Sequence, residues 1–177
     1  WHLNNSFNDS TSRGNNCTNF GSTNILGAIG YARFFKFNQR LDCGPFENLT
    51  QMLTAELWAN ITSNAMTGEY PQFIGKGFEN TNGWRLFIES GSHQVKLGYR
   101  NGSSTYYPLV SQDPPGLNSW YHYAVTYNVP GTIARLYING REVTNSTNVR
   151  VISTNTNPFT IGDQDQGYST NSSVDEV

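Results

Sequence analysis

The chain is dominated by an alternation of apolar and polar residues with a period of two. In the stretch LTAELWANI, Leu53, Ala55, Leu57, Ala59 and Ile61 share one face. The stretches WRLFIES, QVKLGYR, WYHYAVTYN and IARLYING follow the same rule, and no helical period of any length occurs. Since successive side chains of a β-strand point to opposite faces, these stretches are predicted to be strands with one buried face.

Turn-forming residues separate the alternating stretches. Clusters of Gly, Pro, Asn and Asp, such as ENTNG, ESGSH, RNGSS, QDPPGLN and NGRE, lie between them. Short strands with such turns predict an all-β fold, an antiparallel two-sheet β-sandwich. No linker, internal repeat or change of composition divides the chain, so we expect one domain over residues 1–177.

Composition excludes several classes of protein. Charged residues make up only 14% of the chain and aromatic residues another 14%, which argues against disorder. A net charge of −2 gives no reason to expect nucleic acid as a partner. No run reaches the roughly 18 apolar residues of a membrane helix, so membrane insertion is not expected. Neither an initiator Met nor a signal peptide opens the chain, which we interpret as a mature or trimmed form.

Acceptor triplets for N-glycosylation, Asn-x-Ser/Thr, are abundant. With 22 Asn and 33 Ser plus Thr, about four would occur by chance, yet there are eight. One interpretation is accidental triplets in an Asn-rich protein, and the other is a glycosylated protein that is secreted, extracellular or on the cell surface. The even number of cysteines suits one disulfide between Cys17 and Cys43, although two free thiols stay open. We favour secretion. The candidate glycosylation sites are Asn4, Asn8, Asn16, Asn48, Asn60, Asn101, Asn145 and Asn171.

Several motifs, in their order and spacing, resemble the laminin-G-like jelly rolls of the concanavalin A-like lectin/glucanase superfamily. The segments that carry the resemblance are WHLNNSFNDSTSRGNN, LGAIGYARFFKFNQRLDCGPF, LTAELWANI, FIGKG, WYHYAVTYN, RLYINGREV, FTIGD and SVDEV. They span almost the whole chain. The resemblance implies a jelly roll, and it places both cysteines early in the sandwich, where a bridge would pin the opening segment.

The end of the chain departs from the family pattern. In the family the last strand continues beyond Asp-Glu-Val, whereas here it stops at Val177. A sandwich lacking most of one strand would expose unpaired backbone and an apolar groove. Three explanations stay open: the chain simply stops there, the strand is short, or a neighbouring chain supplies the missing strand in self-association by strand addition.

Catalysis is not expected. Glucanases of the superfamily carry a Glu-x-Asp-x-x-Glu strand, because the nucleophile and the acid must flank one glycosidic bond, with carboxyl groups about 5–5.5 Å apart in retaining enzymes. No such trio occurs here: Glu56 and Glu89 are isolated, and the adjacent Asp175 and Glu176 would point to opposite faces of a strand.

Calcium is the one candidate cofactor. The segment GDQDQG offers Asp163 and Asp165, hard oxygen ligands of the kind that Ca²⁺ prefers. Some members of the superfamily also join their first and last segments through calcium, and Asp9 and Asp175 occupy the matching segments. The alternative is that these residues are ordinary turn or strand-end hydrogen-bonding groups.

Aromatic residues beside Asn and Asp suggest a sugar site, since rings stack on the C–H faces of sugars. Tyr106, Tyr107 and Tyr168 are the candidates, although adjacent tyrosines on a strand would alternate, and Trp120 belongs to a fold motif. We therefore predict a noncatalytic extracellular domain for recognition or adhesion, with a glycan or protein ligand. The alternative is a structural subunit of a glycosylated filament or coat, and a glycoside hydrolase is the weakest hypothesis.

Overall fold

The computed structural model describes residues 1–36, 38–45, 50–62, 71–77, 82–113, 115–162 and 171–177. All regular structure in these residues is β-strand, which confirms the all-β prediction. They contain no helix that is long and apolar enough to cross a membrane. The strands are β1 (Thr18–Phe20), β2 (Thr23–Leu26), β3 (Tyr31–Phe35), β4 (Arg40–Asp42), β5 (Met52–Ile61), β6 (Gln72–Gly77), β7 (Gly83–Ile88), β8 (Val95–Asn101), β9 (Ser104–Val110), β10 (Trp120–Asn128), β11 (Ile133–Ile138), β12 (Arg141–Ser146), β13 (Phe159–Gly162) and β14 (Ser172–Asp175).

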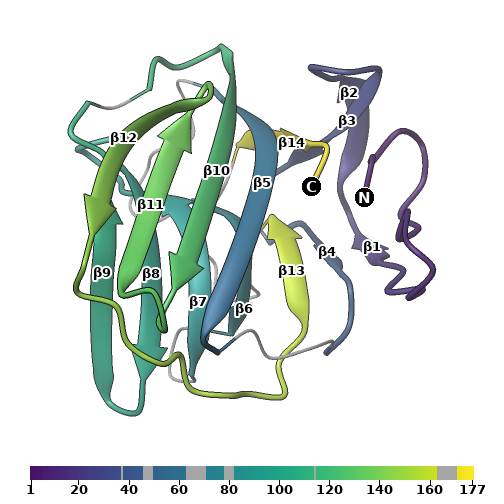
Figure 1. Cartoon of the computed structure of the whole chain (residues 1–177). Coiled ribbons are helices and arrows are strands. Elements are labelled where there is room, and N and C mark those ends of the chain that lie inside the picture. The colour runs from purple at the N-terminus through teal and green to yellow at the C-terminus, as the bar shows by residue number, and fades with distance from the viewer. Residues whose placement is uncertain (37, 46–49, 63–70, 78–81, 114, 163–170) are drawn as a thin grey trace.

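The strands form two seven-stranded antiparallel sheets (Figure 1). The first sheet has the order β1-β4-β13-β6-β7-β8-β9, and the second has the order β12-β11-β10-β5-β14-β3-β2. The sheets pack face to face, so the predicted two-sheet sandwich is confirmed. The short β14 lies inside the second sheet, between β5 and β3, although it is the last strand of the chain.

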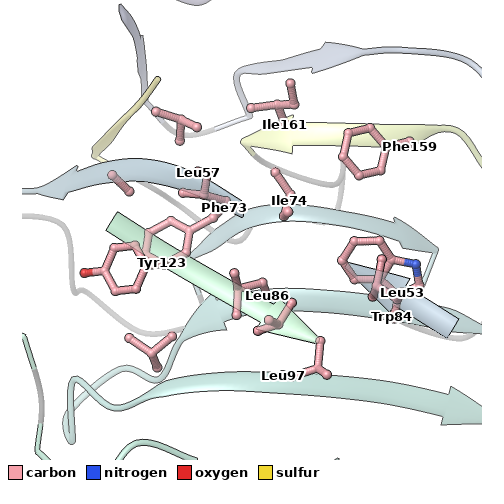
Figure 2. Packing of buried hydrophobic residues seen from close by; sticks show 14 of the residues in the cluster. Leu53, Leu57, Phe73, Ile74, Trp84, Leu86, Leu97, Tyr123, Phe159 and Ile161 are labelled. Atoms are coloured by element: carbon pink, nitrogen blue, oxygen red, sulfur yellow. The ribbon is translucent and has the colours of Figure 1, made fainter. Parts of the chain in front are cut away.

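The core lies between the two sheets and is built from the apolar positions of the alternating strands (Figure 2). Leu57 from the second sheet and Leu86 and Leu97 from the first are fully buried there. Phe73 stacks on Tyr123 across the core, with ring centroids 5.1 Å apart. Burying side chains of this size contributes about 1.5–3 kcal/mol each, so this shared core holds the two layers together.

The opening segment is tied to the sandwich at two points. Cys17 and Cys43 form a disulfide, as predicted, which joins the start of β1 to the end of β4. The backbone N–H of Val177 donates to the carbonyl oxygen of Trp1 over 3.0 Å, so the first and last described residues are neighbours. Figure 1 shows the two ends close together on one side of the molecule.

Candidate functional site

The outer face of the first sheet carries an unusual set of side chains. On β7, Trp84, Leu86 and Ile88 belong to the core, so Arg85 and Phe87 point away from it. All six residues of β7 are nevertheless buried. We call the outward-facing set the outer polar face. Its members are Gln72, Arg85, Phe87, Lys96, Tyr107 and Thr160.

Arg85 lies at the centre of the outer polar face. Its neighbours in register are Gly75 on β6 and Gly98 on β8. A Cβ at Gly75 would lie 3.0 Å from the Cβ of Arg85 and 2.8 Å from the carbonyl oxygen of Trp84, so glycine is required for this close approach. The guanidinium carbon of Arg85 lies 4.4 Å from the centroid of the Phe87 ring, within cation–π range.

Gln72 continues this face toward β13. Its amide nitrogen donates to the hydroxyl of Thr160 over 2.9 Å and to the carbonyl oxygen of Gly162 over 3.3 Å. Its amide oxygen accepts no hydrogen bond from the described residues, although the residue is only 1% exposed. A buried acceptor without a donor is costly, so this oxygen is a point where a water or a ligand hydroxyl would be stabilised.

The accessible part of the outer polar face lies at Tyr107. This side chain is 43% exposed, and its ring contacts that of Phe87 with centroids 5.9 Å apart. The ammonium of Lys96 lies 5.6 Å from the Tyr107 ring centroid and donates to the Glu89 carboxylate over 2.5 Å. The hydrogen bond from Lys96 holds the pKa of Glu89 below its ordinary value. An exposed ring thus adjoins a half-buried ion pair that offers both donors and acceptors.

The aromatic candidates from the sequence fall in different places. Tyr106 points inward, where it stacks on Tyr99 at 5.1 Å, while Tyr107 points outward. Trp120 begins β10 on the outer face of the second sheet, directly opposite Asn60. Tyr168 lies outside the described residues. The structure therefore does not bring Tyr106 and Tyr107 to one surface, and of the two only Tyr107 joins the outer polar face.

The candidate calcium ligands have different surroundings in the structure. The Asp9 carboxylate accepts hydrogen bonds from the backbone N–H groups of Thr11 and Asn15, and these bonds lower its pKa. Asp175 is fully buried and accepts from the N–H of Ile29 over 2.9 Å, and burial raises its pKa. Asp163 and Asp165 lie outside the described residues. Within the described residues, no group of three or more His, Cys, Asp or Glu side chains is placed so that it could hold a metal ion. Calcium binding stays a prediction.

The acceptor asparagines differ in exposure. Asn4, Asn8, Asn16, Asn101 and Asn145 are exposed. Asn60 on β5 and Asn171, just before β14, are half-buried, and Asn48 lies outside the described residues.

A second feature is an apolar groove beside the end of the chain. β14 pairs with β5 only from Ile61 to Trp58, and Met52–Leu57 have no strand partner on that side among the described residues. A pocket of about 290 Å³ lies there, lined by Trp1, Leu53, Ile74, Trp84, Phe159 and Val177 among others. The described residues therefore form an apolar groove beside Val177.

Sequence reasoning missed Gln72, Arg85 and Phe87. The alternation in WRLFIES gave the inner face of its strand correctly, but it does not indicate that the residues between the core positions are buried as well. A signal was present, because an outward-facing Phe beside an Arg is unusual on an open sheet surface.

The sequence and the fold have clear relatives. A family model described as the concanavalin A-like lectin/glucanases superfamily, Laminin_G_3, matches residues 38–177. The chain belongs to this superfamily. Among curated proteins, none matches the sequence significantly.

Solved structures with a similar fold align with most of the chain. Domain 4 of AbnA, a GH43 extracellular arabinanase from Geobacillus stearothermophilus, solved in complex with arabinotriose, is 19% identical with a TM-score of 0.76, over 97% of this chain and 85% of that one. The carbohydrate-binding module CBM66 from Bacillus subtilis is 14% identical with a TM-score of 0.54, over 91% and 92%. The botulinum neurotoxin serotype D binding domain is 16% identical with a TM-score of 0.56, over 85% of this chain and 44% of that one.

Proposed function

We propose that this chain is a noncatalytic carbohydrate-recognition domain of an extracellular glycoprotein. The observation that carries the proposal is the exposed Tyr107 ring beside the Lys96–Glu89 ion pair. A sugar would stack a C–H face on the ring, while the ammonium and the carboxylate would hydrogen-bond its hydroxyl groups. Similarity to domains whose names describe carbohydrate binding supports the same ligand class.

The buried part of the outer polar face would act as a support for this site. Phe87 is fully buried and contacts both the Tyr107 ring and the guanidinium of Arg85. Because the position of Tyr107 depends on a packed neighbour rather than on solvent, its ring is held ready for a ligand. Preorganisation of this kind lowers the entropic cost of binding.

Extracellular placement and adhesion belong to the same proposal. The eight acceptor triplets and the Cys17–Cys43 disulfide are both expected in an oxidising compartment with a glycosylation pathway. A glycan or a protein that displays it is then the partner, and calcium is a candidate cofactor.

The test is a screen of immobilised glycans with the whole chain, with and without calcium, followed by calorimetric titration of the best ligand. Tyr107→Ala is expected to weaken binding about tenfold, in line with the loss of one stacking contact. Tyr137→Ala, on the outer face of the second sheet, is the matched control and should bind like the unchanged chain. Equal losses in both variants, or no glycan bound at all, would sink the proposal.

The apolar groove favours a second candidate function, a filament or coat subunit. A strand from a second copy of the chain, laid along Met52–Leu57, would satisfy the open β5 backbone and fill the pocket beside Val177. Electron microscopy of concentrated protein tests this function. Regular fibres are expected if it holds, whereas dispersed particles at every concentration would argue for the recognition domain alone.

A further inference from the structure

One acceptor asparagine, Asn60, has two tryptophans beside it on the outer face of the second sheet. Leu57, Ala59 and Ile61 of β5 are buried, so Trp58 and Asn60 point to the outer face of the second sheet. Trp120 on β10 is directly opposite Asn60 in the register of the sheet. Directly opposed side chains have Cβ atoms about 4.5–5.5 Å apart, and residues two apart on one strand are only slightly farther. Both indoles are half-buried.

The two ends of the Asn60 side chain and its flanks differ in their surroundings. Its oxygen is buried and accepts no hydrogen bond from the described residues. The half-buried Asn60 side chain thus turns its oxygen toward protein. Ser173 of β14 is the neighbour on the other flank, and it is small and only 4% exposed. Asn60 therefore has a small side chain as its neighbour on the β14 side and an aromatic one on the β10 side.

Other acceptor asparagines have different surroundings. The amide nitrogen of Asn145 donates to the Glu142 carboxylate over 2.7 Å, and its cross-strand neighbour is Arg135. The amide nitrogen of Asn101 donates to the carbonyl oxygen of Val151 over 3.3 Å. Neither has a tryptophan opposite or two residues before it. Asn60 is thus distinguished from both by its aromatic neighbours.

We propose that Asn60 carries an N-linked glycan whose first N-acetylhexosamine packs against the indole of Trp120, with Trp58 flanking it. In this modification the Asn60 amide nitrogen attacks C1 of a lipid-linked oligosaccharide. The C1–N bond forms, the bond from C1 to the lipid diphosphate breaks, and the amide nitrogen loses one proton. Thr62 supplies the hydroxyl of the acceptor triplet.

The physical gain is burial of two half-exposed indoles. A sugar ring presents an apolar C–H face that matches an indole in size and shape, and its hydroxyl groups stay in water. The glycan would therefore stabilise the folded state at Asn60, whereas a glycan at Asn145 would extend into solvent. This inference does not depend on the recognition site, which lies on the other sheet.

The test compares single variants of the whole chain made in a eukaryotic secretory host and in a bacterial host that adds no N-glycan. In the glycosylated material, Asn60→Gln is expected to lower Tm by about 2–5 °C, since one aromatic contact of this kind is modest and the chain is of medium size. Asn145→Gln, the matched control, should change Tm by less than about 1 °C. In material from the bacterial host, both variants should have nearly the same Tm as the parent.

A spectroscopic readout separates stacking from a merely solubilising glycan. The N-acetyl methyl protons of the sugar on Asn60 are expected upfield of those on Asn145, because they lie in the ring current of an indole. Trp120→Phe keeps an aromatic ring at this position but removes the indole, so it should reduce the upfield shift of the methyl signal. An unmodified Asn60 by mass spectrometry, equal Tm changes for the two asparagines, or coincident methyl signals would each overturn the proposal.

Discussion

The outer faces of the two sheets are built from the same alternation and yet have opposite characters. On the first sheet, Gln72, Arg85 and Phe87 point away from the core and are almost completely buried. On the second sheet, Trp58 and Trp120 point away from the core and stay half-exposed. The alternation in the sequence thus determines which side chains point away from the core. Whether those side chains are exposed to solvent depends on the residues packed around them.

Under the two proposals made above, the two sheets have different functions. The first sheet encloses a charged and aromatic layer that supports one accessible tyrosine, a feature suited to selective recognition. The second sheet offers broad, partly open aromatic surface beside an acceptor asparagine, which suits a covalently attached sugar. The two faces can be tested against one another with matched substitutions.

The largest expected effect is loss of the disulfide, which ties the edge of the first sheet and has no counterpart in the second. Cys17 and Cys43 are 26 residues apart, and closing a loop of that size contributes about 3–4 kcal/mol in the chain-entropy model. The double variant Cys17→Ser/Cys43→Ser should lower the free energy of unfolding by about this amount in denaturant titration. An unchanged midpoint with an unchanged slope would show that the edge of the first sheet needs no covalent tie.

The next effect compares an arginine on each outer face. Arg85→Ala is expected to cost about 2–4 kcal/mol, because a fully buried side chain packed on Phe87 leaves a cavity. Arg135→Ala on the second sheet should cost less than about 1 kcal/mol, since its side chain is 40% exposed and its 3.3 Å ion pair with Glu142 is open to solvent. Chemical unfolding of both variants gives the difference directly, and equal costs would erase the distinction between the faces.

The sequence predicted the second sheet better than the first, for a physical reason. On β5 and β10 one face meets the core and the other meets partial solvent, so apolar and polar residues alternate cleanly. On β6 and β7 both faces are buried, and the choice of Gln72 and Arg85 is decided by long-range neighbours such as Thr160 and Gly75. Local pattern contains no information about such partners.

The candidate site shows the same limit. Tyr107 could be proposed from its aromatic, turn-flanked setting, because that information is local. Its neighbours Phe87 and Lys96 come from two other strands, and only the register of β7, β8 and β9 brings them together.

A smaller effect concerns the pH dependence of stability at β14. Burial raises the pKa of Asp175, so the folded state binds this proton more tightly than the unfolded chain does. The associated stability is present below the ordinary carboxyl pKa of 3.8 and is lost as pH rises through the raised value. In Asp175→Asn this loss should disappear from the curve of unfolding free energy against pH.

Asp9 provides the control with the opposite sign. Hydrogen bonds from Thr11 and Asn15 lower its pKa, so its contribution is present above pH 3.8 and is lost on acidification below that value. Asp9→Asn should therefore flatten the acid end of the same curve and leave the decline above pH 4 that Asp175 causes unchanged. Identical curves for the two variants would contradict both assignments.

The smallest expected effect is at the ion pair beside Tyr107. Lys96→Met keeps the apolar stem of the side chain but removes the donor to Glu89, and a partly exposed pair of this kind contributes about 0.2–1 kcal/mol. The hydrogen bond from Lys96 lowers the pKa of Glu89, so this stability is present above the ordinary value of 4.5 and is lost as pH falls through the lowered one. The difference in unfolding free energy between the variant and the parent should therefore be largest near pH 7 and shrink as the pH is lowered below 4.5, and salt should reduce it. If the Lys96→Met variant were as stable as the parent at pH 7 but had lost glycan affinity, the ion pair would be confirmed as a ligand-binding feature.

If the variant lost stability but still bound the glycan, Lys96 would have a structural role like that of Arg85. The Tyr107 ring alone would then remain as the accessible part of the candidate site.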